Sequence, residues 1–412
     1  MKKDNVIVSI SYGFHIRNFL QTKFIYELIK SFNVIIVITE SNQEHLKRFI
    51  DGSGLGMVEI EEVRFIKRSF EETFTSIRKN IFVNPKRTRT KNILNELTGR
   101  NLGYLRYAFS FLNQIFGRFE ISRSFWRQFE SLFIKGKEFD RILQKYDPKK
   151  IITANYGTEP FEIRLLRSAR RHKIPSIAIV PSWDNLTSKG VMGVKPDYLI
   201  VWNEIMAQEA VELHSFKRER IFITGPLQFD NFFYPEFRLS KEDFYKRFKI
   251  ENERPIIVYG TITPKYFKYN LDVLRILKEL IENGEIKRNP KILVRVHPQV
   301  VNDPVFGDNL DEYLKLNAHN VFCFSIPEVQ VWGSIRMPMA SDYKELISAL
   351  TYSKICIASA STLIFDSFAC NTPFIGIGFD GYRENIPYKE SVRRMFDFEH
   401  YKTGYFLNLI LK

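Results

Sequence analysis

Two segments in the second half of the chain carry side chains suited to binding a phosphate group. One short apolar run is followed by His297 and Pro298. Another is followed by three hydroxyl side chains, those of Ser359, Ser361 and Thr362. Such runs are typical of buried parallel strands, whose carboxyl ends form the edge at which open α/β sheets bind ligands. An imidazole and a hydroxyl-rich turn leading into a helix supply donors for a diphosphate, so we predict a nucleotide site without a Walker loop.

Other residues near these strand ends could complete the site. Asp366, one turn into the following helix, could hold ribose or sugar hydroxyls, or it could only compensate the helix dipole. Gly260 and Thr261 end a further strand, where small residues let the backbone approach a phosphate. Arg295 or Lys265 could neutralise a leaving diphosphate in place of a metal ion. Since no Asp-x-Asp pair stands next to a suitable strand, we predict no essential metal ion and no cofactor.

The first half offers Asp184 as the leading candidate for a general base. It follows a predicted strand, and its carboxylate could take a proton from an attacking hydroxyl. Trp183 could shield this carboxylate from water and raise its pKa, while Asn185 and Thr187 could orient it. The alternative is that Asp184 only shapes its loop as an Asx-turn.

Two further residues are candidates for the same role. His15 lies on the loop between the first predicted strand and helix, and Glu159 lies on the loop after the strand that ends at Ala154. The loop that carries His15 lacks the GxGxxG spacing, which argues against a standard dinucleotide site.

The elements that position these residues alternate between strand and helix. This pattern predicts an α/β fold of two Rossmann-like, doubly wound domains, residues 1–227 and 228–412, that face a cleft. A segment at about 64–145 interrupts the first domain with basic and aromatic residues at helical spacing, so we predict a helical insert there. The predicted strands are 6–10, 34–38, 150–154, 176–180, 198–202, 221–225, 255–260, 292–296, 321–324, 355–358 and 374–377. The predicted helices include 17–30, 160–172, 270–283, 342–352 and 362–370.

The net positive charge of the chain predicts an acidic binding partner. The 412 residues carry a formal net charge of +14, with aromatic residues at 15%. The insert is either a lid with solvated Lys and Arg side chains or a surface that docks on anionic lipid, and the charge favours docking on an anionic membrane. We predict no nucleic-acid partner, because no helix-turn-helix, ribonucleoprotein or zinc motif accompanies the charge.

The remaining features of the sequence bear on where the protein acts. Three cysteines without metal spacing indicate a reducing compartment, and neither a signal peptide nor a run long enough to span a membrane is visible. We therefore expect a cytoplasmic protein, peripheral on the inner face of the cell membrane. The apolar, abrupt segment 404–412 suggests a truncated C-terminus.

The motifs of the second half resemble those of GT-B fold enzymes. The pattern of a strand ending in His297-Pro298, then Ser359 to Thr362 and Asp366, is similar to the C-terminal domain of those that build bacterial surface polymers. The CDP-glycerol glycerophosphotransferases, polysialyltransferases and capsule Kdo transferases carry analogous motifs, although Ala358 stands where the glycerophosphotransferases have an acid. The resemblance covers about residues 255–385, and the first half only by topology.

This resemblance implies a metal-independent glycosyltransferase of surface polysaccharide or capsule synthesis. The second domain would bind a nucleotide-activated donor, and the first would bind a glycan or lipid-linked acceptor, with Asp184 as base. In polysialyltransferases an acidic motif supplies the base, and Asp184 matches its position. The alternatives are a CDP-polyol phosphotransferase, a nucleotide-sugar 2-epimerase, and a GT-B scaffold without activity. The epimerase would need further acids and a basic pair around the sugar.

Overall fold

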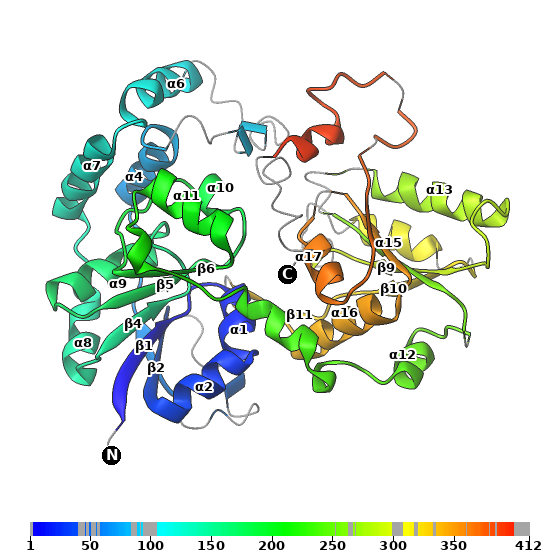
Figure 1. The fold of residues 1–412 in the computed structure, drawn as a ribbon, viewed down its shortest axis with the longest axis horizontal. Coiled ribbons are helices and arrows are strands. Elements are labelled where there is room, and N and C mark those ends of the chain that lie inside the picture. The colour runs from blue at the N-terminus through cyan, green and yellow to red at the C-terminus, as the bar shows by residue number, and fades with distance from the viewer. Residues whose placement is uncertain are drawn as a thin grey trace. The chain divides into compact units, whose positions relative to one another are not determined.

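The chain divides into two compact α/β units, which are described separately (Figure 1). Unit 1 comprises Met1–Asn92, Asn101–Gln228 and Val331–Met337, and unit 2 comprises Ile93–Arg100, Phe229–Gln330 and Pro338–Lys412. The computed structural model describes residues 3–39, 46, 49–50, 55, 58–83, 89–90, 92–93, 105–251, 253–262, 267, 269–298, 308–316, 320–332, 335–359, 361–378, 380–383 and 385–398.

Unit 1 is built on a seven-stranded sheet whose neighbouring strands are all parallel. In spatial order the strands are β3 (Glu59–Val63), β2 (Phe32–Thr39), β1 (Asp4–Ser9), β4 (Lys150–Thr153), β5 (Ser176–Ile179), β6 (Tyr198–Val201) and β7 (Ile221–Ile223). Its helices are α1 (Gly13–Leu20), α2 (Lys23–Ser31), α4 (Ser69–Asn80), α6 (Leu105–Phe116), α7 (Glu120–Phe133), α8 (Asp140–Tyr146), α9 (Pro160–Arg171), α10 (Asn185–Ser188) and α11 (Glu204–His214).

Unit 2 contains a five-stranded sheet, also parallel throughout. The spatial order is β10 (Phe322–Ser325), β9 (Lys291–Arg295), β8 (Ile256–Gly260), β13 (Ile355–Ala358) and β14 (Phe374–Gly376). Its helices are α12 (Lys241–Arg247), α13 (Asn270–Glu282), α15 (Asp308–Lys315), α16 (Ala340–Tyr352) and α17 (Leu363–Ala369). A separate two-stranded sheet pairs β11 (Val329–Trp332) with β12 (Ile335–Pro338).

The unit 2 sheet is covered by helices on both faces. Alternate residues of a strand point to opposite faces. Ile257 and Tyr259 of β8 pack with α13 and α15, whereas Ile256 and Val258 pack with α12 and α16. In unit 1, α8 and α9 pack over β1, β2 and β4. The predicted α/β class with doubly wound parallel sheets is confirmed.

The strand order reverses at one point in each sheet. In unit 1 successive strands lead away from β1 on one side and from β4 on the other, and in unit 2 the same holds for β8 and β13. The loops at such a point diverge to opposite faces and leave a crevice at the carboxyl edge, which is where open α/β sheets bind ligands. The topology therefore predicts that ligand-binding residues lie on the loops after β1, β4, β8 and β13.

The predicted insert is mainly helical in its described residues, and buried charges join it to α9. Arg164 of α9 pairs with Glu71 of α4 at 2.6 Å and with Glu138 at 2.6 Å. A second group joins Glu130 of α7 to Arg167 of α9 at 3.4 Å, and to Arg78 of α4 at 3.5 Å. Glu71 of α4, Glu130 of α7 and Glu138 therefore compensate the two buried arginines of α9.

Three local features differ from the sequence-based expectation. The helix predicted at 17–30 is two helices, because the backbone is extended at Thr22, the N-cap of α2. The edge strand β3 was not predicted, since its Glu-rich sequence Glu59–Val63 lacks the apolar character of a central strand. The pair β11–β12 was also missed. Among the described residues, no helix is long and apolar enough to cross a membrane.

Candidate functional site

The loops after β8 and β9 are joined at the carboxyl edge of the unit 2 sheet. The backbone N–H of His297 donates a hydrogen bond to Thr261 Oγ1 at 2.8 Å, and the Thr261 N–H donates to the Arg295 carbonyl at 3.0 Å. Gly260 lies against α17, because a Cβ added there would stand 2.2 Å from Leu363 Cδ2. Gly260, Thr261 and His297 therefore lie together beside the switch point, as predicted from their strand ends.

The hydroxyl-rich turn after β13 is the other wall of this switch point. Ser359 is buried, and its hydroxyl has no hydrogen-bond partner in the described structure. Ser361 Oγ accepts a hydrogen bond from the Leu363 N–H at 3.2 Å and so caps the start of α17. Thr362 is exposed, and Asp366 lies half-buried in the first turn of α17. Leaving a buried hydroxyl unpaired costs about 1–3 kcal/mol, so Ser359 is the described side chain of this turn that would gain most from a further hydrogen-bond partner.

Arg295 has a different environment from the one expected. Its guanidinium is buried and donates to Asp342 Oδ2 at 2.6 Å and to Ser325 Oγ at 2.7 Å, while Glu345 lies 3.7 Å away. These carboxylates already compensate the charge. Its ion pairs with Asp342 and Glu345 give Arg295 a structural role between β9 and α16. Contact between Arg295 and a diphosphate stays a prediction, and these ion pairs do not favour it.

His297 is a neutral imidazole at neutral pH. Burial, with a smaller contribution from the Arg295 charge, lowers the pKa of His297 to about 4. A neutral ring still donates one hydrogen bond to a phosphate oxygen, and a bound dianion would favour its protonation. Pro298 follows at the same edge, whereas the predicted Lys265 lies outside the described residues.

At the unit 1 switch point, the half-buried Ser11 forms a polar cluster with the buried side chains of His15 and Glu162. The Ser11 hydroxyl donates to Glu162 Oε1 at 2.5 Å and lies 3.4 Å from His15 Nδ1. The Ser11 N–H also donates to His15 Nδ1, at 3.3 Å, which places the ring proton on Nε2. Burial raises the pKa of Glu162 to about 7 and lowers that of His15 to about 3. Near neutral pH, Glu162 is therefore the group in this cluster that can exchange a proton.

The rim of this cluster carries groups of both signs. Tyr12 packs edge-on against the His15 ring, with centroids 5.4 Å apart, and its hydroxyl donates to Glu159 Oε2 at 3.4 Å. Lys79 of α4 lies 3.6 Å from Glu159 Oε1, and burial lowers the pKa of Lys79, with Lys189 adding to the effect. The third candidate base, Glu159, therefore lies beside His15 at the same edge.

Asp184 stands on the loop after β5, one strand away from the switch point. Its carboxylate accepts hydrogen bonds from the Ser182 and Ser188 hydroxyls, each at 2.7 Å, and from Asn185 Nδ2 at 3.3 Å. The Thr187 hydroxyl binds the backbone carbonyl of Asp184 instead of the carboxylate. The half-buried carboxylate is oriented as a base would need, but the same contacts also fit the loop-shaping alternative.

Sequence reasoning missed Ser11, Glu162 and Lys79. Glu162 lies among the charged residues of α9, and only the packing of that helix against β1 reveals that it is buried. Among the described residues, no group of three or more His, Cys, Asp or Glu side chains is arranged to hold a metal ion. The prediction of metal independence awaits an assay.

Comparisons with solved structures identify the fold. The UDP-GlcNAc 2-epimerase of Neisseria meningitidis matches 98% of this chain and 94% of its own, at 10% identity and a TM-score of 0.52. The enzyme of the same name from Methanocaldococcus jannaschii matches 96% and 91%, at 11% identity and 0.52. A glycosyltransferase from Rickettsia africae matches 97% and 88%, at 13% identity and 0.50. No family model and no curated protein matches the sequence. The likeness establishes the two-unit GT-B fold.

Proposed function

We propose that the protein is a glycosyltransferase that uses a nucleotide-activated sugar. The observation that carries this proposal is the buried, unpartnered hydroxyl of Ser359 at the unit 2 switch point, across from the Thr261–His297 contact. A diphosphate at this edge would accept hydrogen bonds from Ser359 and from the neutral imidazole of His297. Gly260 allows the end of β8 to pack closely against Leu363 of α17 beside this turn.

Unit 1 would bind the acceptor and activate its hydroxyl. Asp184 is held by three hydrogen bonds and would take the proton as the acceptor oxygen attacks the sugar. Lys79 and Glu159 on the same edge would position polar groups of the acceptor. Cationic and neutral donors of the protein would stabilise the leaving diphosphate, which is the electrostatic task that a metal ion performs elsewhere.

A donor screen by thermal shift tests the first part of the proposal. The panel contains UDP-GlcNAc, the ligand of the Neisseria structure, together with CDP-glycerol and CMP-, GDP- and ADP-linked sugars. A true donor at a hundredfold excess over its Kd stabilises the protein by about 2.7 kcal/mol. Ser359→Ala should lose most of this gain. Ser353→Ala, at the opposite end of β13, is the matched control and should keep it. Equal shifts in both variants would contradict the assigned site.

A second candidate function, nucleotide-sugar 2-epimerisation, is favoured by the acids of unit 1. Glu162, Glu159 and Asp184 lie on the loops and helix after two neighbouring strands, with Lys79 and Lys189 near them. These groups would supply the further acids and the basic pair that we expect this reaction to need. Incubation with a donor in D₂O separates the functions, because an epimerase exchanges the C2 proton without net release of nucleotide. A transferase releases nucleotide when an acceptor is added and leaves C2 undeuterated.

The finer assignments extend this proposal. We place the enzyme in surface polysaccharide or capsule synthesis, with a glycan or lipid-linked acceptor, on the inner face of the cell membrane. The support is the net charge of +14 and the motif pattern of His297-Pro298 and Ser359 to Thr362. If only CDP-glycerol stabilises the protein, the function would be polyol-phosphate transfer. If no donor does, the chain would be a GT-B scaffold without activity.

A further inference from the structure

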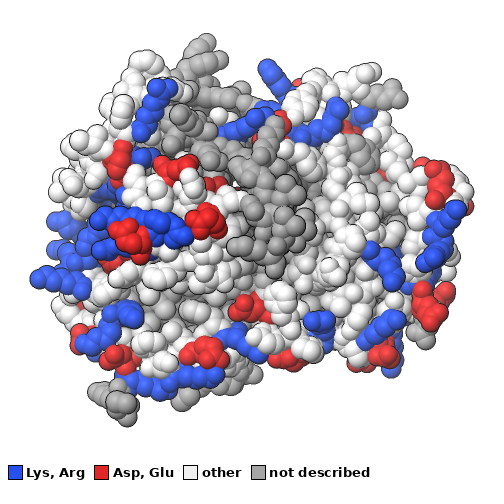
Figure 2. Space-filling model, viewed as in Figure 1, with Lys and Arg blue, Asp and Glu red and all other residues white. Residues whose placement is uncertain are grey.

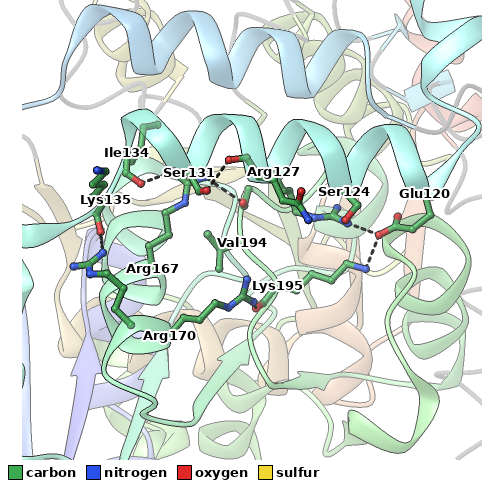
Figure 3. A pocket seen from close by; sticks show the side chains of 13 residues that line it. Glu120, Ser124, Arg127, Ser131, Ile134, Lys135, Arg167, Arg170, Val194 and Lys195 are labelled. Atoms are coloured by element: carbon green, nitrogen blue, oxygen red, sulfur yellow. Dashed lines mark hydrogen bonds and ion pairs between the residues drawn. The ribbon is translucent and has the colours of Figure 1, made fainter.

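A strongly basic pocket lies in unit 1, between α7, the end of α9 and the loop before β6 (Figure 3). Its volume is about 630 Å³. One carboxylate, Glu120, and six cationic side chains line it: Arg127, Lys135, Arg167, Arg170, Arg171 and Lys195. Since Lys195 precedes β6, the pocket lies at the amino edge of the sheet, away from the carboxyl edge that carries Asp184 and Glu162.

The single carboxylate in the pocket is shared among several cations. Glu120 accepts a hydrogen bond from Lys195 at 2.8 Å and forms ion pairs with Arg127 and Arg123. Burial opposes the ionisation of Glu120, but these cations overcome it and lower its pKa to about 2. Burial lowers the pKa of Lys195, and the Arg127 charge adds to this effect. Positive charge is thus crowded around one anion.

Two cations of the pocket, Lys135 and Arg170, have no carboxylate partner in the described structure. By contrast, Arg171 pairs with Asp140 at 2.6 Å, and Arg167 pairs with the buried Glu130. The exposed side chain of Lys135 forms no ion pair with the described residues, and Arg170 donates to the backbone carbonyl of Lys195. Figure 2 shows Lys and Arg side chains gathered on the left flank of unit 1, where Figure 1 draws α7 and α9. The pocket therefore has an excess of positive charge that suits an anionic ligand.

The same helix presents an exposed apolar row next to the pocket. Ile121, Phe125 and Leu132 of α7 are 79%, 68% and 65% exposed. They are offset from the pocket-lining residues Ser124 and Gln128 by about a sixth of a turn around the helix. A helix at the surface of a globular protein normally turns such apolar side chains toward the core. An apolar row beside a cationic face is the arrangement by which helices lie in the interface of an anionic membrane.

We propose that this face of unit 1 docks on an anionic membrane, with a lipid phosphate group in the pocket and the apolar row of α7 in the interface. A dissolved phosphate would use the cations alone and would leave Ile121, Phe125 and Leu132 in water. A lipid carries both the phosphate and the apolar surface that these side chains need. The docking site lies at the amino edge of the unit 1 sheet and uses none of the residues assigned to the donor or the acceptor, so it would hold the enzyme at the membrane without occupying those residues.

Vesicle binding of the full chain tests the role of the cations. Wild type should bind vesicles of phosphatidylcholine with phosphatidylglycerol and should bind pure phosphatidylcholine far more weakly. The double variant Lys135→Gln/Arg170→Gln should bind the anionic vesicles about 30-fold more weakly, because each cation near such a surface contributes a factor of about five. The control Lys287→Gln/Lys354→Gln removes the same charge from exposed sites in unit 2. Equal losses in the two double variants would overturn the assigned pocket.

The apolar row has its own test, which separates a lipid from a dissolved phosphate. Phe125→Ser should weaken binding to the anionic vesicles about tenfold, whereas Phe233→Ser, at a 67% exposed site of unit 2, should not. Calorimetry with glycerol phosphate measures the pocket without a membrane. Tight binding of glycerol phosphate, together with vesicle binding that is unaffected by Phe125→Ser, would mean a dissolved ligand and would overturn the proposal. All these measurements are made without donor, so their failure is distinguishable from failure of the proposed transfer reaction.

Discussion

Glu162 should make the stability of unit 1 depend on pH, and Glu162→Gln should remove that dependence. Burial raises the pKa of this carboxyl from 4.5 to about 7, against the opposing hydrogen bond from Ser11. Because the folded pKa lies above the unfolded one, the folded state binds the extra proton, and its contribution to stability is lost as the pH rises toward 7. Linkage over this shift amounts to about 2.5 kcal/mol between pH 5 and 8.

Urea unfolding followed by tryptophan fluorescence measures this difference. All four tryptophans lie in segments of unit 1, namely Trp126, Trp183, Trp202 and Trp332. The buried amide of Glu162→Gln adds a cost that does not vary with pH, so the prediction concerns the trend. The free energy of unfolding of the variant minus that of wild type should rise by about 2.5 kcal/mol from pH 5 to 8. The ionisable histidines of the chain are common to both proteins and largely cancel.

A matched control and a clear contrary outcome complete the experiment. Glu204→Gln changes an exposed carboxyl of α11, whose charge is solvated in both states, so its difference from wild type should vary much less with pH. If the difference for Glu162→Gln is flat between pH 5 and 8, or falls, then this carboxyl does not carry a raised pKa. It would then also be unsuited to proton exchange near neutral pH.

Four further outcomes follow from the site. His297→Ala should weaken donor binding in calorimetry about tenfold without unfolding the protein, since one hydrogen bond to a charged phosphate is lost; unchanged affinity would remove this residue from the site. Asp184→Asn should lower turnover by about 10²–10⁴-fold at nearly constant donor affinity, whereas loss in His15→Ala alone would move the role of base to His15. Activity should survive EDTA, and loss that Mg²⁺ restores would refute metal independence. Gly260→Ala places a Cβ 2.2 Å from Leu363 Cδ2 and should destabilise unit 2 by about 1–3 kcal/mol in urea unfolding.

The sequence predicted the sheets well because buried parallel strands leave a local signature. The apolar runs that became β1, β4, β8 and β13 are readable without the fold, and so are the loops that follow them. Positions such as Thr261 and His297 could therefore be assigned to one edge in advance. Strand β3 was not predicted, because an edge strand tolerates a charged sequence such as Glu59–Val63, which lacks an apolar run.

Pairing between distant charges left no such signature. Arg295 looked like a free cation at a strand end, but Asp342, 47 residues later in the chain, neutralises it. Glu162 stands among the charged residues of α9, and only the burial of that helix distinguishes it from a solvated surface charge. Both cases depend on which side chains meet in space, which neither periodicity nor spacing in a single sequence specifies.

The ion pairs between α9 and the helical insert restrict how this domain can be shortened. Arg164 and Arg167 are buried cations whose carboxylate partners include Glu71 of α4 and Glu130 of α7. A deletion that removed α4 and α7 would leave Arg167 without its carboxylate and Arg164 with Glu138 alone. Breaking a buried pair from one side costs about 3–5 kcal/mol, so a shortened domain would have to replace Arg167 with an apolar residue in the same step. The insert is thus an integral part of the core of unit 1, although its basic and aromatic sequence interrupts the strand and helix alternation of this domain.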